Sequence, residues 1–216
     1  MKKIYFIRHG DVDTKTDAEG RKLVYPPDAP LSLTGIDQLK KVANRLLSEG
    51  ISLDAIFSSP FTRALQSAQI LLAKLHVPVF ITLKDLMDVN KNSWVGQPLE
   101  DYAKIGGDIY SHPLSADQET LQHLLQRAQR ALRIIGISDY ESIGVVSHGD
   151  LLSGVDWMLK TPEEVPTYTK MKNRFYLQKG QVAEYTLGKR LRIEGQVRLI
   201  TVDEVQLSRE LFRGRV

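Results

Sequence analysis

The stretch IYFIRHG, residues 4–10, decides the fold class of this chain. Its first four residues are apolar, and the run ends abruptly at Arg8 and His9, which Gly10 follows. A short apolar run that stops at polar and glycine residues is typical of a buried strand. We therefore predict a strand over residues 4–7, with the side chains of Arg8 and His9 at its carboxyl end.

Similar apolar runs alternate with helical periodicity along the chain. The helical pattern after Thr34, a predicted N-cap, ends at Gly50, and Ser59 with Pro60 is predicted to begin the next helix. This alternation predicts one three-layer α/β domain over residues 1–216, with a mostly parallel sheet and helices on both faces. Residues 83–116 lack sustained periodicity and are predicted to be a loop-rich insertion. The predicted strands are 55–57, 79–81, 143–146, 183–187 and 191–201, and the further helices are 60–75, 117–135 and a segment ending near 159.

The composition excludes several classes of protein. The 216 residues include no cysteine, which excludes disulfide scaffolds, thiolate metal sites and cysteine nucleophiles. Apolar residues make up 42% and charged residues 25%, as in an ordinary globular domain. No apolar run approaches the length of a membrane span, and the apolar run near the start is too short for a signal peptide. We therefore expect a cytoplasmic protein without a membrane partner.

The basic charge is concentrated near the carboxyl end of the chain. Residues 1–169 hold 18 Lys and Arg against 21 Asp and Glu, whereas residues 170–216 hold 11 against 5. This basic segment lacks the interleaved aromatic residues of single-strand binders and any groove-reading motif. We predict no nucleic-acid partner, and we expect the segment at most to attract anionic substrates in a salt-sensitive way.

Two histidines are predicted to lie at the same edge of the sheet. His9 follows the first predicted strand directly, and His148 follows a later one. Ligands of such sheets bind beyond the carboxyl ends of the strands. Arg8 and Arg63 are placed to reach the same edge, whereas the remaining histidines are expected on helix surfaces and in a loop: His76, His112 and His123.

These residue types predict phosphoryl transfer. Two guanidinium groups, Arg8 and Arg63, with a protonated His148, can bind a phosphate dianion. A neutral imidazole at His9 can attack phosphorus and form a phosphohistidine. The leaving oxygen needs an acid, and Asp88 can supply it if burial and the nearby phosphate raise its pKa. Weaker candidates for the acid are Asp85, Glu100 and Asp101.

Four motifs in order resemble the histidine phosphatase superfamily, which includes the cofactor-dependent phosphoglycerate mutases and many small phosphatases. IYFIRHG resembles its strand with Arg-His-Gly, and LSLTG at 31–35 with Gln38 resembles its Leu-Ser-x-x-Gly-x-x-Gln. SSPFTRALQSA at 58–68 and VVSHG at 145–149 resemble the other two. The resemblance implies a phosphoglycerate mutase-like fold, a nucleophilic His9, and a phosphoryl group held by Arg8, Arg63 and His148.

The chain departs from the family pattern around the acid. The family has Glu in Leu-x-Glu-x-x-x-Gly-x-Trp-x-Gly, and LMDVNKNSWVG at 86–96 has Asp88 there, Asn92 for the first Gly and Val95 where Glu is frequent. The shorter acid places its proton about 1.5 Å further back, a displacement that can cost roughly a hundredfold in rate. Thr14 and Lys15 stand where mutases usually have Trp-Asn, which argues against glycolytic mutase activity.

The leading hypothesis is a metal-independent and cofactor-independent phosphatase of small phosphomonoesters. A mutase that returns the phosphoryl group to a second hydroxyl and a weakly active regulatory protein that binds phosphate esters remain alternatives. A metallohydrolase that uses His9 with Asp11 and His148 with Asp150 is a further alternative, although the adjacent Arg8 would repel a cation. The sequence predicts neither the substrate nor the oligomeric state.

Overall fold

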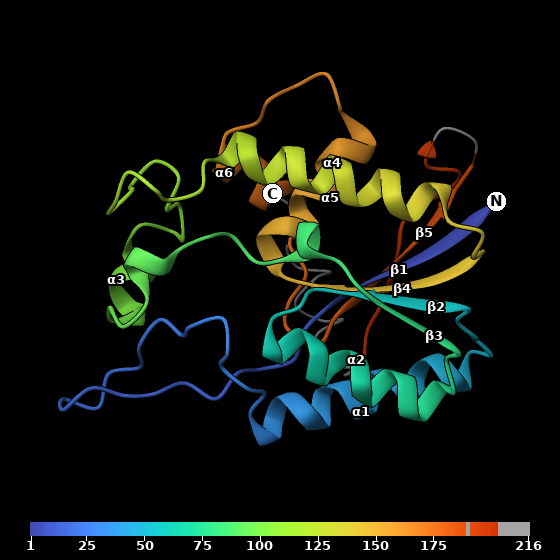
Figure 1. Cartoon of the computed structure of the whole chain (residues 1–216), viewed down its shortest axis with the longest axis horizontal. Helices are drawn as coiled ribbons and strands as arrows, with labels where there is room; N and C mark the ends of the chain where they lie inside the picture. The colour runs from blue at the N-terminus through green and yellow to red at the C-terminus, as the bar shows by residue number, and fades with distance from the viewer. Residues whose placement is uncertain (189–190, 203–216) are drawn as a thin grey trace, which may run out of the picture.

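The computed structural model describes residues 1–188 and 191–202, and these residues build one six-stranded sheet (Figure 1). The sheet order is β3-β2-β4-β1-β5-β6, so β1 lies between β4 and β5. The pairs β3–β2, β2–β4 and β4–β1 are parallel, whereas β5 and β6 are added antiparallel. The strands are β1 Lys2–Arg8, β2 Ala55–Ser58, β3 Val79–Thr82, β4 Ser142–Ser147, β5 Val182–Leu187 and β6 Arg198–Ile200.

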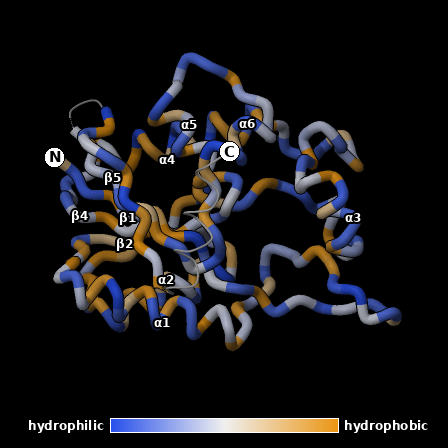
Figure 2. Tube along the Cα trace, turned by 180° about the vertical axis from the view of Figure 1, so that it is seen from behind, coloured by the Kyte–Doolittle hydropathy of each residue, from blue (hydrophilic) through white to orange (hydrophobic). Residues whose placement is uncertain are grey.

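Helices cover both faces of the sheet, which confirms the predicted three-layer α/β architecture (Figure 1). One layer contains α1 and α2, which pack against each other, and the opposite layer contains α4 and α5, with α6 beside α5. In α1, α2 and α4 buried positions alternate with exposed ones, whereas residues 149–157 of α5 are all buried. Figure 2 shows hydrophobic and hydrophilic residues mixed along these helices. The helices are α1 Leu33–Ser48, α2 Thr62–Leu75, α4 Leu121–Ile137, α5 Gly149–Lys160 and α6 Tyr168–Arg174.

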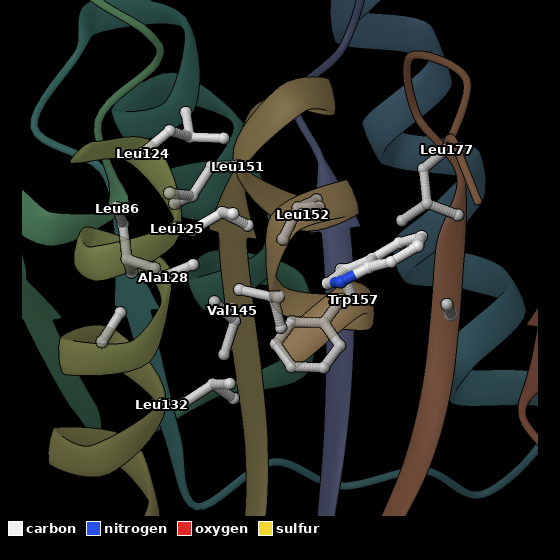
Figure 3. Close-up of a cluster of buried hydrophobic side chains, with 14 of the residues drawn as sticks. Leu86, Leu124, Leu125, Ala128, Leu132, Val145, Leu151, Leu152, Trp157 and Leu177 are labelled. Atoms are coloured by element: carbon white, nitrogen blue, oxygen red, sulfur yellow. The ribbon is translucent and has the colours of Figure 1, made fainter. Parts of the chain in front are cut away.

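The larger core cluster lies between the sheet and the layer of α4 and α5. Figure 3 shows Leu124 and Leu125 of α4 and Leu151 of α5 packing over Val145 of β4. Trp157, at the other end of α5, is buried in the same cluster. Full burial of such side chains contributes roughly 1.5–3 kcal/mol each. This packing fixes the ends of β4 and α5, between which His148 lies.

Two glycines from separate motifs allow the loop after β1 to pack on the start of α1. A Cβ atom on Gly10 would lie 2.4 Å from the carbonyl oxygen of Gly35, and a Cβ atom on Gly35 would lie 2.1 Å from that of Asp11. No side chain fits at either position. The Arg-His-Gly and Leu-Ser-x-x-Gly stretches therefore form a single contact that sets the path of the chain just after His9.

The insertion and the loop at residues 11–30 lie together beyond the carboxyl ends of the parallel strands (Figure 1). The two are joined by a bridge between Leu23 and Pro98, and the Val24 amide donates to the Gln97 carbonyl at 2.8 Å. The insertion is mostly loop, as predicted, but it also contains three short helices. These are η1 Lys84–Leu86, η2 Asn92–Trp94 and α3 Leu99–Lys104.

Several predicted boundaries are wrong for identifiable reasons. The N-cap of α1 is Ser32 and not Thr34, because extended Ser32 accepts the Gly35 amide with its hydroxyl at 3.0 Å. Helix α2 begins at Thr62 and not at Pro60, because Ser59 Oγ accepts the Phe61 amide in a turn that precedes the helix. The predicted strand at 191–201 shortens to β6, and α3 and α6 are too short to show a helical period.

The described part of the basic segment uses its charges within the molecule. Arg198 pairs with Glu49 and Glu184, and Lys179 pairs with Asp11. The basic segment also contains residues 189–190 and 203–216, which lie outside the described residues. Within the described ranges, no helix has both the length and the apolar character that crossing a bilayer requires.

Candidate active site

The two predicted histidines meet at the ends of adjacent parallel strands. His9 follows β1 and His148 follows β4, and the register pairs Arg8 with Ser147 immediately before them. The ring centroids of His9 and His148 are 5.1 Å apart, and each residue is 1% exposed. The sheet therefore brings together two side chains that are far apart in the sequence, as the strand-end argument predicts.

His9 is held with one ring nitrogen free to react. Its Nδ1 lies 2.7 Å from the Gly10 carbonyl oxygen, which can only accept a hydrogen bond, so Nδ1 carries the proton and Nε2 the lone pair. Burial lowers the pKa of His9 well below its ordinary value, and the charges of His148, Arg63 and Arg8 act in the same direction. His9 is therefore a neutral imidazole, the form that acts as a nucleophile.

Arg8 and Arg63 are fixed beside the histidines by backbone carbonyls and aromatic rings. Arg8 Nη1 donates to the Leu177 carbonyl at 2.7 Å, and its guanidinium lies 4.9 Å from the Tyr176 ring centroid. Arg63, in the first turn of α2, donates through Nη1 to the carbonyls of Pro26 and Pro27, both at 3.3 Å. Arg63 is 1% exposed, which is rare for a charged side chain without a functional role.

Three buried donors of this site have no hydrogen-bond partner among the residues that the structure describes. They are Nε of Arg8, Nε of Arg63 and Nδ1 of His148. Buried polar atoms in proteins are almost always paired, so a group of unpaired donors points to a ligand. Two guanidinium groups and an imidazole favour an anion, and their planar geometry fits phosphate oxygens.

His148 is neutral in the structure, whereas the sequence analysis predicts a protonated ring. Burial lowers its pKa well below the ordinary value, Asp88 opposes this shift, and Arg63, Lys91 and Arg8 reinforce it. Its Nε2 lies 2.8 Å from Ser59 Oγ, whose hydroxyl can donate to it, and its Nδ1 faces the Asp88 carboxylate at 3.9 Å, which favours a proton on Nδ1. That leaves the ring proton on Nδ1, directed toward the unpaired side of the site.

Asp88 is buried in the site, but it is held as a carboxylate. Its Oδ2 accepts from Arg63 Nη2 at 2.9 Å and from Lys91 Nζ at 3.0 Å, and it lies 3.9 Å from His148 Nδ1. Burial raises the pKa of Asp88, as the sequence analysis expects, but Lys91, His148 and Arg63 outweigh burial and hold the pKa well below its ordinary value. The other candidate acids pair on the surface instead: Asp85 with Arg130, Asp101 with Lys104 and Glu100 with Arg21.

Lys91 is a site residue that the sequence analysis misses. Its side chain is 14% exposed and lies between Asp88 and the rings of Tyr25 and Tyr102, at 5.5 and 5.6 Å from their centroids. The spacing of three residues from Asp88 is the only sequence signal for this pair. Such a spacing is common among unrelated surface charges, so the pattern alone does not mark a site.

Asp150 is a second buried carboxylate that the functional prediction leaves out. Its oxygens accept hydrogen bonds from the hydroxyls of Tyr110, Tyr168 and Tyr176, each at 3.1 Å. Burial raises the pKa of Asp150, and nearby Asp88 raises it further. Because the three tyrosines come from the insertion, from α6 and from the segment after it, Asp150 ties these segments to the start of α5.

The site opens into two cavities. The smaller, of about 220 Å³, is lined by Arg8, His9, Asp88, Lys91 and Asp150 among others. The larger, of about 720 Å³, shares Tyr25, Asp88 and Lys91 with it and extends along the insertion to the start of α4. The chemistry belongs to the smaller cavity, because His9 and Arg8 line it, and the larger cavity is next to it.

The pairs proposed as metal ligands do not form a metal site. Asp11 pairs with Lys179 and Ser32, and Asp150 binds tyrosine hydroxyls. Across residues 1–188 and 191–202, no three His, Asp or Glu side chains come together in a geometry that could hold a metal ion. The remaining histidines lie elsewhere: His76 caps the end of α2, His112 is exposed, and His123 lines the larger cavity.

Known proteins resemble this chain in sequence and in fold. The chain is 28% identical over 161 residues to the adenosylcobalamin/alpha-ribazole phosphatase of Escherichia coli K12, covering 70% of this chain and 75% of the relative. It is 31% identical over 159 residues to phosphoglycerate mutase-like protein 4 of Arabidopsis thaliana, covering 69% and 67%. The structure of YhfR from Bacillus stearothermophilus has the same fold, with a TM-score of 0.71, 22% identity and coverage of 92% of this chain and 96% of the other.

Residues 4–174 match the family profile described as the histidine phosphatase superfamily, branch 1. That range contains Arg8, His9 and Asp88, which line the smaller cavity, Arg63, which lines the larger one, and His148, whose ring lies 5.1 Å from that of His9. The chain belongs to the histidine phosphatase superfamily.

Proposed function

We propose that this protein is a metal-independent phosphatase that hydrolyses small phosphomonoesters through a phosphohistidine on His9. The observation that carries the proposal is a neutral, buried His9 with its Nε2 free, beside three unpaired donors suited to phosphate. A nucleophile and a set of anion-binding groups in one buried cavity are the two requirements of phosphoryl transfer.

In the first half-reaction, Arg8, Arg63 and His148 hold the phosphoryl group against His9. Nε2 of His9 forms a bond to phosphorus as the bond from phosphorus to the ester oxygen breaks. Asp88, once protonated, gives its proton to the leaving oxygen, so that a neutral alcohol departs. In the second half-reaction, the Asp88 carboxylate takes a proton from water, the water oxygen bonds to phosphorus, and the bond to His9 breaks.

The alcohol part of the substrate is proposed to occupy the larger cavity. Its apolar lining includes Pro27, Phe61 and Val89. Among the described residues that line it, each Lys and Arg already has an acidic partner, because Lys91 and Arg63 pair with Asp88 and Arg127 binds Glu119 through two nitrogens. A substrate with a carboxylate near its phosphate would find no unpaired Lys or Arg there. We therefore propose esters of uncharged alcohols as substrates.

This charge pattern also bears on the mutase alternative. Phosphoglycerates carry a carboxylate, so the larger cavity favours hydrolysis of other esters over transfer between phosphoglycerate hydroxyls. Thr14 and Lys15 line a separate cavity on the far side of Tyr25. We also propose a cytoplasmic location, for which the support is the sequence alone.

Trapping of the covalent intermediate tests the proposal. Brief incubation with ³²P-labelled ester followed by denaturation should yield an acid-labile, base-stable phosphohistidine, and EDTA should not reduce it. His9→Ala should abolish both the label and turnover. His112→Ala, which removes an exposed histidine, is the matched control and should retain both. Full activity of His9→Ala would overturn the proposal, and a label without phosphate release would favour the regulatory alternative.

A further inference from the structure

Two of the groups proposed to bind phosphate, Arg63 and His148, converge with Lys91 on one oxygen of Asp88. Arg63 Nη2 lies 2.9 Å and Lys91 Nζ 3.0 Å from Asp88 Oδ2, and His148 Nδ1 lies 3.9 Å from the same atom. Two of these three groups are the proposed phosphoryl ligands Arg63 and His148. The Asp88 carboxylate thus occupies the anionic position among cations that a phosphoryl oxygen would also take.

A bound phosphate dianion and an ionised Asp88 cannot share these partners at low cost. Like charges placed side by side in a buried site cost several kcal/mol. Asp88 is 8% exposed, so little solvent screens it. Either the anion binds weakly, or Asp88 loses its charge as the anion takes over Arg63.

We propose that binding of a tetrahedral dianion displaces the Asp88 carboxylate from Arg63 and adds one proton to it, with Lys91 as a further phosphoryl-site residue that stays beside both. The inference rests on the proposed function, because it concerns the same site. The proton comes from solvent to Asp88 Oδ2, and during turnover it passes to the leaving oxygen as the phosphorus–oxygen bond breaks. Substrate binding itself would thereby convert Asp88 from a base into the acid that the reaction needs.

Other groups around Asp88 are potential sites for the same proton. Asp150 already has three tyrosine donors that stabilise its charged form, and Nε2 of His148 already accepts a hydrogen bond from the Ser59 hydroxyl. Arg127 donates to the Asp88 backbone carbonyl at 3.3 Å. The charged and titratable groups that face Asp88 are Arg8, Arg63, Lys91, His148, Asp150, Tyr102, Tyr110 and Tyr176.

Lys91 is suited to remain with the anion. It lines both cavities, and it lies over Tyr25 and Tyr102, so its ammonium can move between Asp88 and a phosphoryl oxygen without leaving the aromatic rings. The chain contains a matched pair for comparison. Asp101 and Lys104 have the same spacing and a 2.7 Å contact, but they are exposed, at 46% and 71%.

Calorimetry with sulfate as the probe measures the proton directly. Sulfate is a tetrahedral dianion that does not titrate near neutral pH, so any proton taken up belongs to the protein. The binding heat at pH 8 is measured in two buffers of different ionisation enthalpy, and the difference gives the number of protons taken up per sulfate. We expect about one proton for the unsubstituted protein. No uptake would overturn the proposal.

Asp88→Asn identifies the group that takes the proton. This variant should bind sulfate roughly 10⁴-fold or more tightly at pH 8, since it need not take up a proton at a pH more than four units above the pKa of Asp88, and its proton uptake should fall close to zero. Asp101→Asn should leave both quantities unchanged. If Asp88→Asn keeps the full uptake, the proton goes to another group such as His148 or Asp150, and the proposal is wrong.

Lys91→Met tests the second part of the proposal. It should weaken sulfate binding roughly tenfold, whereas Lys104→Met should not change it. Equal sulfate affinity in Lys91→Met and the unsubstituted protein would remove Lys91 from the phosphoryl site. These binding experiments need no turnover. If the phosphohistidine forms on His9 and sulfate binds without proton uptake, this inference fails while the proposed function stands.

Discussion

Ser59 Oγ lies 2.8 Å from Nε2 of His148, and this contact leaves Nδ1 as the ring nitrogen available to a ligand. Ser59 Oγ accepts a hydrogen bond from the Phe61 amide and donates one to Nε2 of the ring. The ring proton is therefore on Nδ1, on the side where Asp88 lies. A residue with no role in bond making thus sets the tautomer of one that binds the phosphoryl group.

Ser59→Ala should lower kcat/KM about fivefold. The change removes one hydrogen bond of about 1 kcal/mol, so that the His148 ring no longer has one preferred tautomer. Nitrogen-15 NMR of the histidine ring would show a mixture of tautomers in the variant and one tautomer in the unsubstituted protein. Ser138→Ala, which removes a hydroxyl that donates to the Ile135 carbonyl far from the site, is the control. An unchanged ring spectrum in Ser59→Ala would contradict this role.

Asp88→Asn should slow the hydrolysis of alkyl phosphates by roughly 10²–10⁴-fold, because an alkoxide is a poor leaving group without a proton donor. The same variant should lose far less with p-nitrophenyl phosphate, whose leaving group departs as a stable anion. Steady-state kinetics on the two esters measures the difference. A similar loss on both would show that Asp88 does not act as the acid, and Asp101→Asn should lose nothing on either.

Stability should fall as the pH drops below about 6.5. The unfolded chain takes up protons on histidines near that pH, whereas the pKa of His9 and of His148 is well below its ordinary value in the folded protein. The free energy of unfolding therefore decreases by about 1.4 kcal/mol per pH unit for each of the two histidines. Asp88 adds a further loss only below about pH 4, since its pKa is also lowered.

Chemical denaturation at several pH values measures this slope. The His9→Gln/His148→Gln double variant should show a much flatter dependence between pH 6.5 and 4.5. His112→Gln, which changes an exposed histidine, should keep the slope of the unsubstituted protein. Equal slopes in the two variants would mean that the buried histidines are not the source.

The kcat/KM values of a panel of phosphate esters should depend on the charge of the alcohol part. Esters of neutral alcohols should have kcat/KM values at least roughly tenfold above those of phosphoserine and 3-phosphoglycerate. The reason is that Lys91 and Arg127 are already neutralised by Asp88 and Glu119. Glu119→Gln should narrow the gap, because it leaves Arg127 without its acidic partner. A preference for the carboxylate esters in the unsubstituted protein would contradict the proposed substrate class.

Gly35→Ala should destabilise the protein by roughly 1–3 kcal/mol, because the new methyl group would overlap the Asp11 backbone. Activity should fall as well, since the loop that positions His9 must move. Gly154→Ala is a matched control within a helix, where the nearest atom to an added Cβ is the Leu124 side chain at 3.4 Å. That change should be neutral or stabilising by up to about 1 kcal/mol. Thermal melts compare the two.

The residues at the sheet edge could be predicted from sequence, because a strand end is marked by a local pattern of residues. Apolar runs that stop at Arg8-His9 and at Ser147-His148 indicate both the strands and the positions of the reactive side chains. The parallel order of the sheet then brings them together without any long-range information. The sequence also predicts Arg63 as a residue of the site, because it lies in the first turn of α2.

The charge states of the site could not be predicted in this way. Whether Asp88 is a protonated acid or a carboxylate depends on Lys91 and Arg63, and their contacts follow from the path of a loop without periodicity. The tyrosines that bind Asp150 come from three separate segments, and α6, which carries one of them, is too short to show an amphipathic pattern. The start of α1 differs from the prediction because Ser32 and Thr34 can both serve as its cap, and the start of α2 differs because Ser59 forms a turn that precedes the helix.

The construction of the larger cavity has an evolutionary consequence. Most of its wall comes from residues 87–95 and 116–127, whereas His9, Arg8 and His148 come from the ends of β1 and β4. Substitutions in that wall can therefore change which ester is accepted while the phosphoryl-transfer groups remain under separate selection. Within residues 87–95 and 116–127, Asp88 and Lys91 are the exception, since they line both cavities. We therefore expect substitutions that change the substrate range to be tolerated at most positions of the wall and to be rare at these two.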